Sequence, residues 1–216
     1  MKKTLMTILV SGLMLASCSK QETTDNPLLQ KWDTPFETAP FEKIKVEHYL
    51  PAFEAAIAEH NEEIQAIIDN AEAPTFDNTI AALDYSGETL SKVAGVFFNM
   101  MAANTSEELQ KVNEQVGPMM ATHSDNVSMN AKLFEKIKAV YDAKDSQKYT
   151  GEQLALLEKT YNKFVRSGAL LDAAKQEELR KVNAELTKVE SKFDANLLKE
   201  SKAYQLVIDK EENLKG

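Results

Sequence analysis

Apolar side chains recur every three or four residues along most of the chain after residue 46, which is the period of an amphipathic helix. The first helix predicted from this pattern begins near Val46 and ends at residues 71–74, where Pro74 stops it. Glutamates occupy one face, and Pro51 lies in the first turn, where a proline is tolerated. The opposite, apolar face is formed by Phe53, Ile57, Ile64, Ile67 and Ile68.

Two further helices follow, each opened by capping residues. Thr75 or Asp77 can cap a helix that runs to about residue 101. Thr105 and Glu108 have the spacing of a capping box and predict a third helix, which the pair at residues 117–118, Gly-Pro, should kink or interrupt. The inward residues expected from the spacing are Ile80, Leu83, Leu90, Val93, Phe97 and Met101 in the second helix, and Leu109, Val112, Val116 and Met120 in the third.

The remainder predicts three more helices and one strand. Leu133, Ile137 and Val140 mark a short fourth helix. A capping box of Thr150 and Gln153 opens a fifth helix, which ends at Gly168. The apolar residues of the fifth helix are Leu154, Leu157, Tyr161 and Phe164. The sixth covers about residues 172–202. Its apolar seam is formed by Leu179, Val182, Leu186, Val189, Phe193 and Asn196, spaced by three and four in alternation. That spacing fits a coiled coil, but an antiparallel hairpin with a preceding helix is favoured, because earlier helices supply partners.

The fold class is therefore all-α, an antiparallel helical bundle of hairpins with one short C-terminal strand. The strand is predicted for residues 204–208 (YQLVI), and no second strand-like run is present to pair with it. Before the helices, Pro27, Pro35 and Pro40 predict an irregular segment that Trp32 and Phe36 should pin onto the helical body.

The N-terminus has the pattern of an export signal. Lys2 and Lys3 precede an apolar stretch, residues 5–15, that is too short to span a membrane permanently. Residues 15–18 (LASC) fit a bacterial lipobox, so we expect residues 1–17 to be a signal peptide and Cys18 to carry lipid. Residues 18–26 would then be a polar tether, and the protein an exported lipoprotein that faces the periplasm from the outer membrane. The alternative is an ordinary cleaved signal with a chance cysteine.

Composition narrows the class further. The formal net charge is −9, and removal of the signal with its two lysines makes the protein more acidic, which argues against nucleic acid as a partner. One cysteine excludes a disulfide scaffold, seven glycines exclude a collagen-like chain, and the lack of a second long apolar run excludes a polytopic membrane protein. Attachment to a membrane would therefore depend on the N-terminal lipid alone.

The residues themselves assign no catalytic group and no metal ligand. His48, His60 and His123 are the only histidines, and no two of them have the i, i+4 spacing that presents a pair of ligands on one helix. We interpret each as a surface or helix-packing residue. The paired glutamates fall on predicted solvated faces, where nothing perturbs their pKa for acid–base work. They are Glu62 and Glu63, Glu107 and Glu108, and Glu177 and Glu178.

A family resemblance indicates a function, which the individual residues do not assign. The N-terminal segment contains Asn26-Pro27-Leu28-Leu29, Trp32, Thr34-Pro35-Phe36, Pro40-Phe41, Ile44, His48 and Pro51-Ala52. These are followed, in order, by Pro74-Thr75-Phe76, Asn78-Thr79-Ile80, Ala82-Leu83, Ser86-Gly87, Leu133-Phe134, Ile137, Leu156-Leu157-Glu158, Tyr161, Phe164, Arg166, Gly168-Ala169, Leu171, Asn183, Leu186, Phe193 and Asn196. The ordered set resembles the N-terminal region of the M3 zinc peptidases, which include peptidyl-dipeptidases (dipeptidyl carboxypeptidases) and oligopeptidase A.

This resemblance implies a helical clamshell that binds short peptides in a channel and cuts them with one zinc ion. Residues 27–216 would be the incomplete N-terminal helical domain, which helps to wall that channel. The His-Glu-x-x-His motif of the family does not occur in these residues, so we expect the chain alone to be inactive and to hold no zinc cofactor.

A separate catalytic half would then be a partner. Its absence should leave apolar surface exposed around Phe97, Phe98, Met100 and Met101 and at residues 204–208, with self-association as the result. The alternative is a non-catalytic, membrane-anchored helical lipoprotein that binds peptides or a partner protein; a coiled-coil assembly protein ranks third. The reading frame beyond residue 216 distinguishes the first two.

Overall fold

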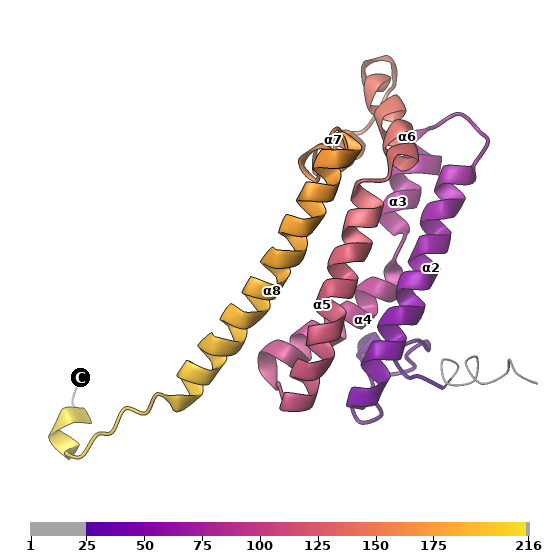
Figure 1. Ribbon diagram of the computed structural model, residues 1–216. Helices are drawn as coiled ribbons and strands as arrows, with labels where there is room; N and C mark the ends of the chain where they lie inside the picture. Colours follow the sequence, from indigo (N-terminus) through magenta and orange to yellow (C-terminus); the bar gives the residue numbers. More distant parts are fainter. Residues whose placement is uncertain (1–24, 215–216) are drawn as a thin grey trace, which may run out of the picture.

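The structure is a computed structural model that describes residues 25–214, so the predicted signal peptide, Cys18 and most of the tether lie outside the described part. Six helices of twelve or more residues form the body (Figure 1): α2 (Tyr49–Asp69), α4 (Glu88–Ala103), α5 (Glu107–Ser128), α6 (Ala131–Asp142), α7 (Gly151–Arg166) and α8 (Ala173–Ala203). Shorter elements are the 3₁₀ turns η1 (Pro35–Glu37), η2 (Val46–His48), η4 (Lys144–Ser146) and η5 (Glu211–Leu214), the π-helical turn η3 (Phe76–Ala81) and the single turn α3 (Ala82–Tyr85). No strand occurs in residues 25–214, and the all-α prediction is confirmed.

Two apolar cores lie along α2. The first half of α2 packs with α4 and α5 around Phe53 and Phe97, which are both fully buried and whose ring centroids are 5.4 Å apart. The second half packs with η3, α6 and α7 around Ile80, Leu133 and Leu157, which are also fully buried. Figure 1 shows α4 beside one end of the long α2–α5 pair and α6 with α7 at the other. Helix α2 therefore organises both ends of the body.

The predicted helix at residues 77–101 is wrong as one element. Thr75 does cap its start: the Thr75 hydroxyl accepts from the Asn78 backbone N–H at 3.1 Å, and the Asn78 side chain accepts from the Thr75 N–H at 2.8 Å. The helical path then stops at Ser86 and Gly87. Gly87 has a φ of 73°, a left-handed conformation that glycine adopts without a Cβ penalty, and the chain restarts there as α4.

Helix α5 differs from the prediction at its start and at its middle. Ser106, rather than Thr105, is the N-cap, and its hydroxyl accepts from the Leu109 N–H at 3.3 Å. A kink or an interruption was expected at Gly117 and Pro118. The interruption is wrong, since α5 runs unbroken from Glu107 to Ser128, and the kink stays a prediction. Pro118 removes one backbone hydrogen bond, while the fully buried Val116 before it fixes the helix in the core.

The last two helices begin where the sequence predicts. The capping box of Thr150 and Gln153 is formed at the start of α7, and Gly168 ends that segment with a φ of 95°. Asp172 caps α8 by accepting from the Lys175 N–H at 2.9 Å. Helix α8 packs antiparallel against α5, which agrees with the favoured hairpin interpretation.

The C-terminal part of α8 extends away from the bundle (Figure 1). None of the α8 residues is buried, so the predicted inward seam is wrong for this helix. Residues 204–210 have no regular structure, and the strand predicted at residues 204–208 is also wrong; the described chain offers no strand to pair with it. As expected, Tyr204, Val207 and their neighbours are exposed.

The N-terminal segment is held at Trp32 but not at Phe36. The Trp32 indole N–H donates to the Pro27 carbonyl at 2.8 Å, and the Lys92 ammonium lies 4.4 Å from the Trp32 ring centroid. Phe36 is 98% exposed, so its predicted anchoring role is wrong. Exposure was also expected around Phe97 and Phe98. Phe98 is 44% exposed, as expected, but Phe97 is fully buried, because Tyr49 and Phe53 of α2 pack against its ring.

Candidate functional site

The described residues contain no ready metal centre. Within residues 25–214, no group of three or more histidine, cysteine, aspartate or glutamate side chains is arranged to hold a metal ion. None of the helices in this part of the chain combines the length and the apolar character needed to cross a membrane. The position of the predicted lipidation site, Cys18, falls outside the described residues.

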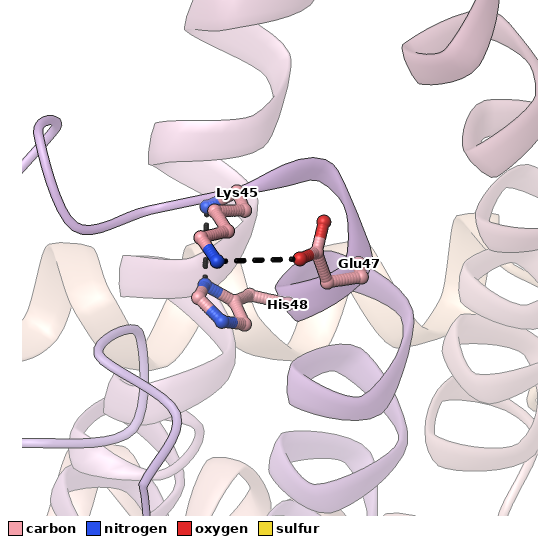
Figure 2. A network of polar contacts seen from close by, with 3 residues as sticks. All are labelled: Lys45, Glu47 and His48. Atoms are coloured by element: carbon pink, nitrogen blue, oxygen red, sulfur yellow. Dashed lines mark hydrogen bonds and ion pairs between the residues drawn. The ribbon is translucent and has the colours of Figure 1, made fainter.

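His48 has a local structural role. Its Nδ1 accepts a hydrogen bond from the Lys45 backbone N–H at 3.0 Å, and the Lys45 ammonium lies 3.8 Å from the Glu47 carboxylate (Figure 2). The interaction closes the turn η2 that leads into α2. His48 is therefore a capping residue of this turn.

The other two histidines meet between α2 and α5, where His123 is buried and His60 is half-buried. His60 of α2 and His123 of α5 are 63 residues apart in sequence, yet His60 Nδ1 and His123 Nε2 are 2.9 Å apart. On its other side, His60 Nε2 lies 3.1 Å from the Ser86 hydroxyl. The Ser86 hydroxyl in turn donates to the Leu83 carbonyl at 2.7 Å. We call His60, His123 and Ser86 the histidine cluster; it joins α2, α5 and the break between α3 and α4.

Glu63 and Gly87 border the His60 ring. The Glu63 carboxylate, one turn after His60 on α2, accepts a hydrogen bond from the Gly87 N–H at 2.7 Å. A Cβ atom at Gly87 would come within 3.0 Å of the His60 ring, so only glycine lets the backbone approach this closely. The sequence interpretation of Glu63 as a purely solvated residue is therefore wrong.

Burial dominates the electrostatics of the histidine cluster. Desolvation lowers the pKa of His60, while the Glu63 charge raises it and Lys163 of α7 lowers it. The pKa of His123 is lowered by burial first and by the neighbouring His60 second. Both imidazoles are therefore held in the neutral form at neutral pH.

The cluster does not have the layout of a nucleophile and base. Because the Ser86 proton is directed at the Leu83 carbonyl, the serine oxygen is an acceptor toward His60 rather than a donor. His60 is thus not placed to remove that proton, which activation of a serine nucleophile needs. The arrangement can instead bind and release protons on its two rings.

Two shallow hollows flank the histidine cluster. One, of about 350 Å³, is lined by His123 together with Asn61, Pro118 and Thr122. The other, of about 420 Å³, is lined by Ser86 together with Glu63, Asn70 and Tyr85. Both are open and mostly apolar, so they give solvent a route to the two ends of the cluster.

The sequence contained a signal for the histidine contact. His60 follows Phe53 and Ile57 at spacings of seven and three, and His123 follows Val116 and Met120 in the same way. Each histidine therefore continues the apolar face of its own helix. The interpretation of both as helix-packing residues is confirmed, but only the fold shows that they pack on each other.

A second feature is the uncovered apolar face of α8. The α8 stripe is formed by Val182, Leu186, Val189, Phe193 and Leu197, which are between 51% and 64% exposed. Nearer its start, α8 is fixed to α5: the Asn183 side chain donates to the Asp125 carboxylate at 2.8 Å, and Arg180 donates to the Asn126 side chain at 3.0 Å.

The comparison with known families decides the relationship. Residues 53–177, more than half of the chain, match the family described as "Neurolysin/Thimet oligopeptidase, N-terminal domain". The chain belongs to the neurolysin/thimet oligopeptidase N-terminal domain family. The resemblance to M3 peptidases drawn from the sequence is thereby confirmed, for the N-terminal part.

Individual relatives match most of the chain. The chain is 36% identical over 194 residues to dipeptidyl carboxypeptidase of Escherichia coli (strain K12), an alignment that covers 90% of the chain and 28% of the relative. It is 37% identical over 191 residues to dipeptidyl carboxypeptidase of Salmonella typhimurium, covering 88% and 28%. Oligopeptidase A of E. coli is 25% identical over 194 residues, covering 88% and 28%. The chain thus spans little more than a quarter of the length of these relatives.

Proposed function

We propose that this chain serves as the N-terminal, channel-walling part of a zinc-dependent peptidyl-dipeptidase that acts on short peptides. The observation that carries the proposal is the alignment of 90% of the chain with a dipeptidyl carboxypeptidase. Because His-Glu-x-x-His does not occur in the 216 residues, zinc and the catalytic groups have to be supplied by residues outside them. The role of this chain is then to shape and restrict the peptide channel.

The α8 stripe supports this proposal as the contact with the catalytic part. Five large apolar side chains in sequence along one helix leave a continuous apolar surface, which marks an interaction site more often than free surface. Arg180 and Asn183 bond α8 to α5, while the α8 stripe stays exposed and is open to packing against a second element.

A chimera tests the function directly. Residues 25–214 of this chain would replace the aligned N-terminal 28% of E. coli dipeptidyl carboxypeptidase, and cleavage of a short peptide would be measured with and without a chelator. We expect chelator-sensitive release of dipeptides. A chimera that is folded, as judged by circular dichroism, and inactive would contradict the proposal and favour a non-catalytic peptide- or partner-binding lipoprotein.

Two adjacent positions provide a matched control for the α8 stripe. Val189→Lys places a charge in the stripe, whereas Glu190→Lys places the same side chain on the neighbouring, exposed position. Burying an unpaired charge at an interface is costly. We therefore expect Val189→Lys to reduce activity of the chimera at least tenfold, by about 1.4 kcal/mol or more, and Glu190→Lys to leave it near the parent value. Equal activities would contradict the assignment of the stripe.

The cellular location is proposed separately from the activity. The lipobox ending in Cys18 supports an exported lipoprotein anchored by lipid and facing the periplasm, on the outer membrane. Cys18→Ala should release the protein from the membrane fraction or leave it as an unprocessed precursor. If the Cys18→Ala protein is correctly cleaved and still sediments with membranes, the predicted lipid anchor at Cys18 is wrong.

A further inference from the structure

The histidine cluster has a defined direction of hydrogen bonding. Since the Ser86 hydroxyl donates to the Leu83 carbonyl, it accepts from His60, and the proton of neutral His60 is on Nε2. The other ring nitrogen of His60, Nδ1, is then an acceptor. His123 therefore carries its proton on Nε2 and donates it to His60 across the 2.9 Å contact.

The charged groups around this cluster do not compensate for added protons. On α2, the Glu63 carboxylate favours a charged His60, but burial of the ring opposes that charge more strongly and the pKa of His60 stays lowered. On α7, Lys163 opposes a charge on His60. On α5, Asp125 lies two residues beyond His123, and its carboxylate accepts from Asn183 of α8. The break between α3 and α4 contributes only the neutral Ser86 hydroxyl.

We propose that the contact between His60 and His123 is a proton-sensitive latch that holds α5 against α2 while the rings are neutral and releases it when both are protonated. With one added proton on His123 Nδ1, the bond from His123 Nε2 to His60 Nδ1 can persist. With a second proton, both facing nitrogens carry N–H groups, so neither can accept, and two positively charged rings face each other with these nitrogens 2.9 Å apart. The contact then has to open.

Opening at this point reaches beyond the two rings. His123 is 6% exposed and lies on the same helix as Asp125 and Asn126, which hold the start of α8. The hollow lined by His123 gives protons and water access without prior unfolding. Acidification is therefore transmitted from α2 through α5 to the base of α8. This inference does not depend on the proposed peptidase function.

The sign of the pH dependence follows from linkage. Both folded-state pKa values lie below the unfolded value of about 6.5, so the unfolded chain binds more protons just below that pH. Stability contributed by the pair is fully present above about pH 6.5 and is lost as the pH falls through the folded pKa values. Each proton taken up on unfolding lowers the folded-to-unfolded ratio about tenfold per pH unit.

Urea unfolding of the full chain between about pH 7.5 and pH 5 tests the latch. For the unmodified protein, we expect the folded-to-unfolded ratio to fall by up to about a hundredfold per pH unit, as two protons are bound. His123→Gln keeps a side-chain donor toward His60 but cannot titrate, and should reduce this to about tenfold. His48→Gln, at the capping histidine, is the matched control and should keep the steep dependence.

A spectroscopic measurement on the unmodified protein keeps the test independent of whether the variant folds. Nitrogen NMR of the imidazole rings should show Nε2–H tautomers for both His60 and His123 at neutral pH, and both rings should titrate below about pH 6.5. Amide signals of α5 near His123 should shift with the same midpoints. The latch would be overturned if both rings titrated near pH 6.5 while the α5 amide signals did not shift. It would also be overturned if the unfolding free energies of the parent and of His123→Gln depended on pH in the same way.

Discussion

Replacing Gly87 by alanine should destabilise the protein through two separate effects. Gly87 adopts a φ of 73°, where an L-residue with a Cβ costs about 1–2 kcal/mol. In addition, the new Cβ would lie 3.0 Å from two atoms of the His60 ring, closer than ordinary van der Waals contact. The ring cannot easily yield, because His123 and Ser86 hold it from both sides.

The two contributions give an expected loss of about 2–5 kcal/mol, since overpacking in a filled site adds about 1–3 kcal/mol to the backbone cost. Gly95→Ala is the matched control. Gly95 lies in the exposed middle of α4 with open space around its missing Cβ, so alanine there should stabilise the protein by about 0.5–1 kcal/mol.

Urea unfolding followed by circular dichroism measures both changes at neutral pH. The fluorescence of Trp32 provides a second probe, and coincident unfolding curves from circular dichroism and fluorescence support two-state unfolding. If Gly87→Ala alters the unfolding free energy by less than about 0.5 kcal/mol, the close approach of Gly87 to His60 does not determine stability and the argument is wrong.

Three further predictions address the core, a helix cap and the metal. Phe97→Ala should lower the free energy of unfolding in urea by about 3–5 kcal/mol, because Phe97 is fully buried between Tyr49 and Phe53. Phe36→Ala, at a ring that is 98% exposed, should lower it by less than about 0.5 kcal/mol. Equal decreases for the two variants would refute the assignment of Phe97 to the core. Thr150→Ala should lower stability by about 1 kcal/mol through loss of the α7 capping box; an unchanged unfolding midpoint would contradict it. A chelator should leave the thermal midpoint of the chain unchanged, whereas a lower midpoint together with stoichiometric zinc in the purified protein would show a structural or catalytic site.

The sequence by itself determined the helical class, most helix ends and the family. Apolar periodicity and local caps such as Thr150 with Gln153, and Asp172, act within one turn of the chain, so they can be read without knowing the fold. The same holds for the ordered set of short motifs that indicated the M3 resemblance and that the family match confirms.

Where neighbours in space decide the outcome, the local pattern was insufficient. Gly87 divides a stretch that reads as one helix, because its backbone has to pass against His60 and bond to Glu63. Conversely, Pro118 is carried inside an unbroken α5, since the packed residues before it fix the helix. Both results reflect tertiary packing that outweighs a local conformational preference.

The tertiary structure alone decided which side chains meet and which stay uncovered. His60 and His123 each read as one more residue on an apolar helix face, and their 2.9 Å contact arises only because α2 and α5 cross at that level. The seam of α8 reads as a buried face, yet it is exposed along most of its length. Periodicity records that a face is apolar, but burial depends on a partner surface, which is a property of the folded arrangement and not of the helix itself.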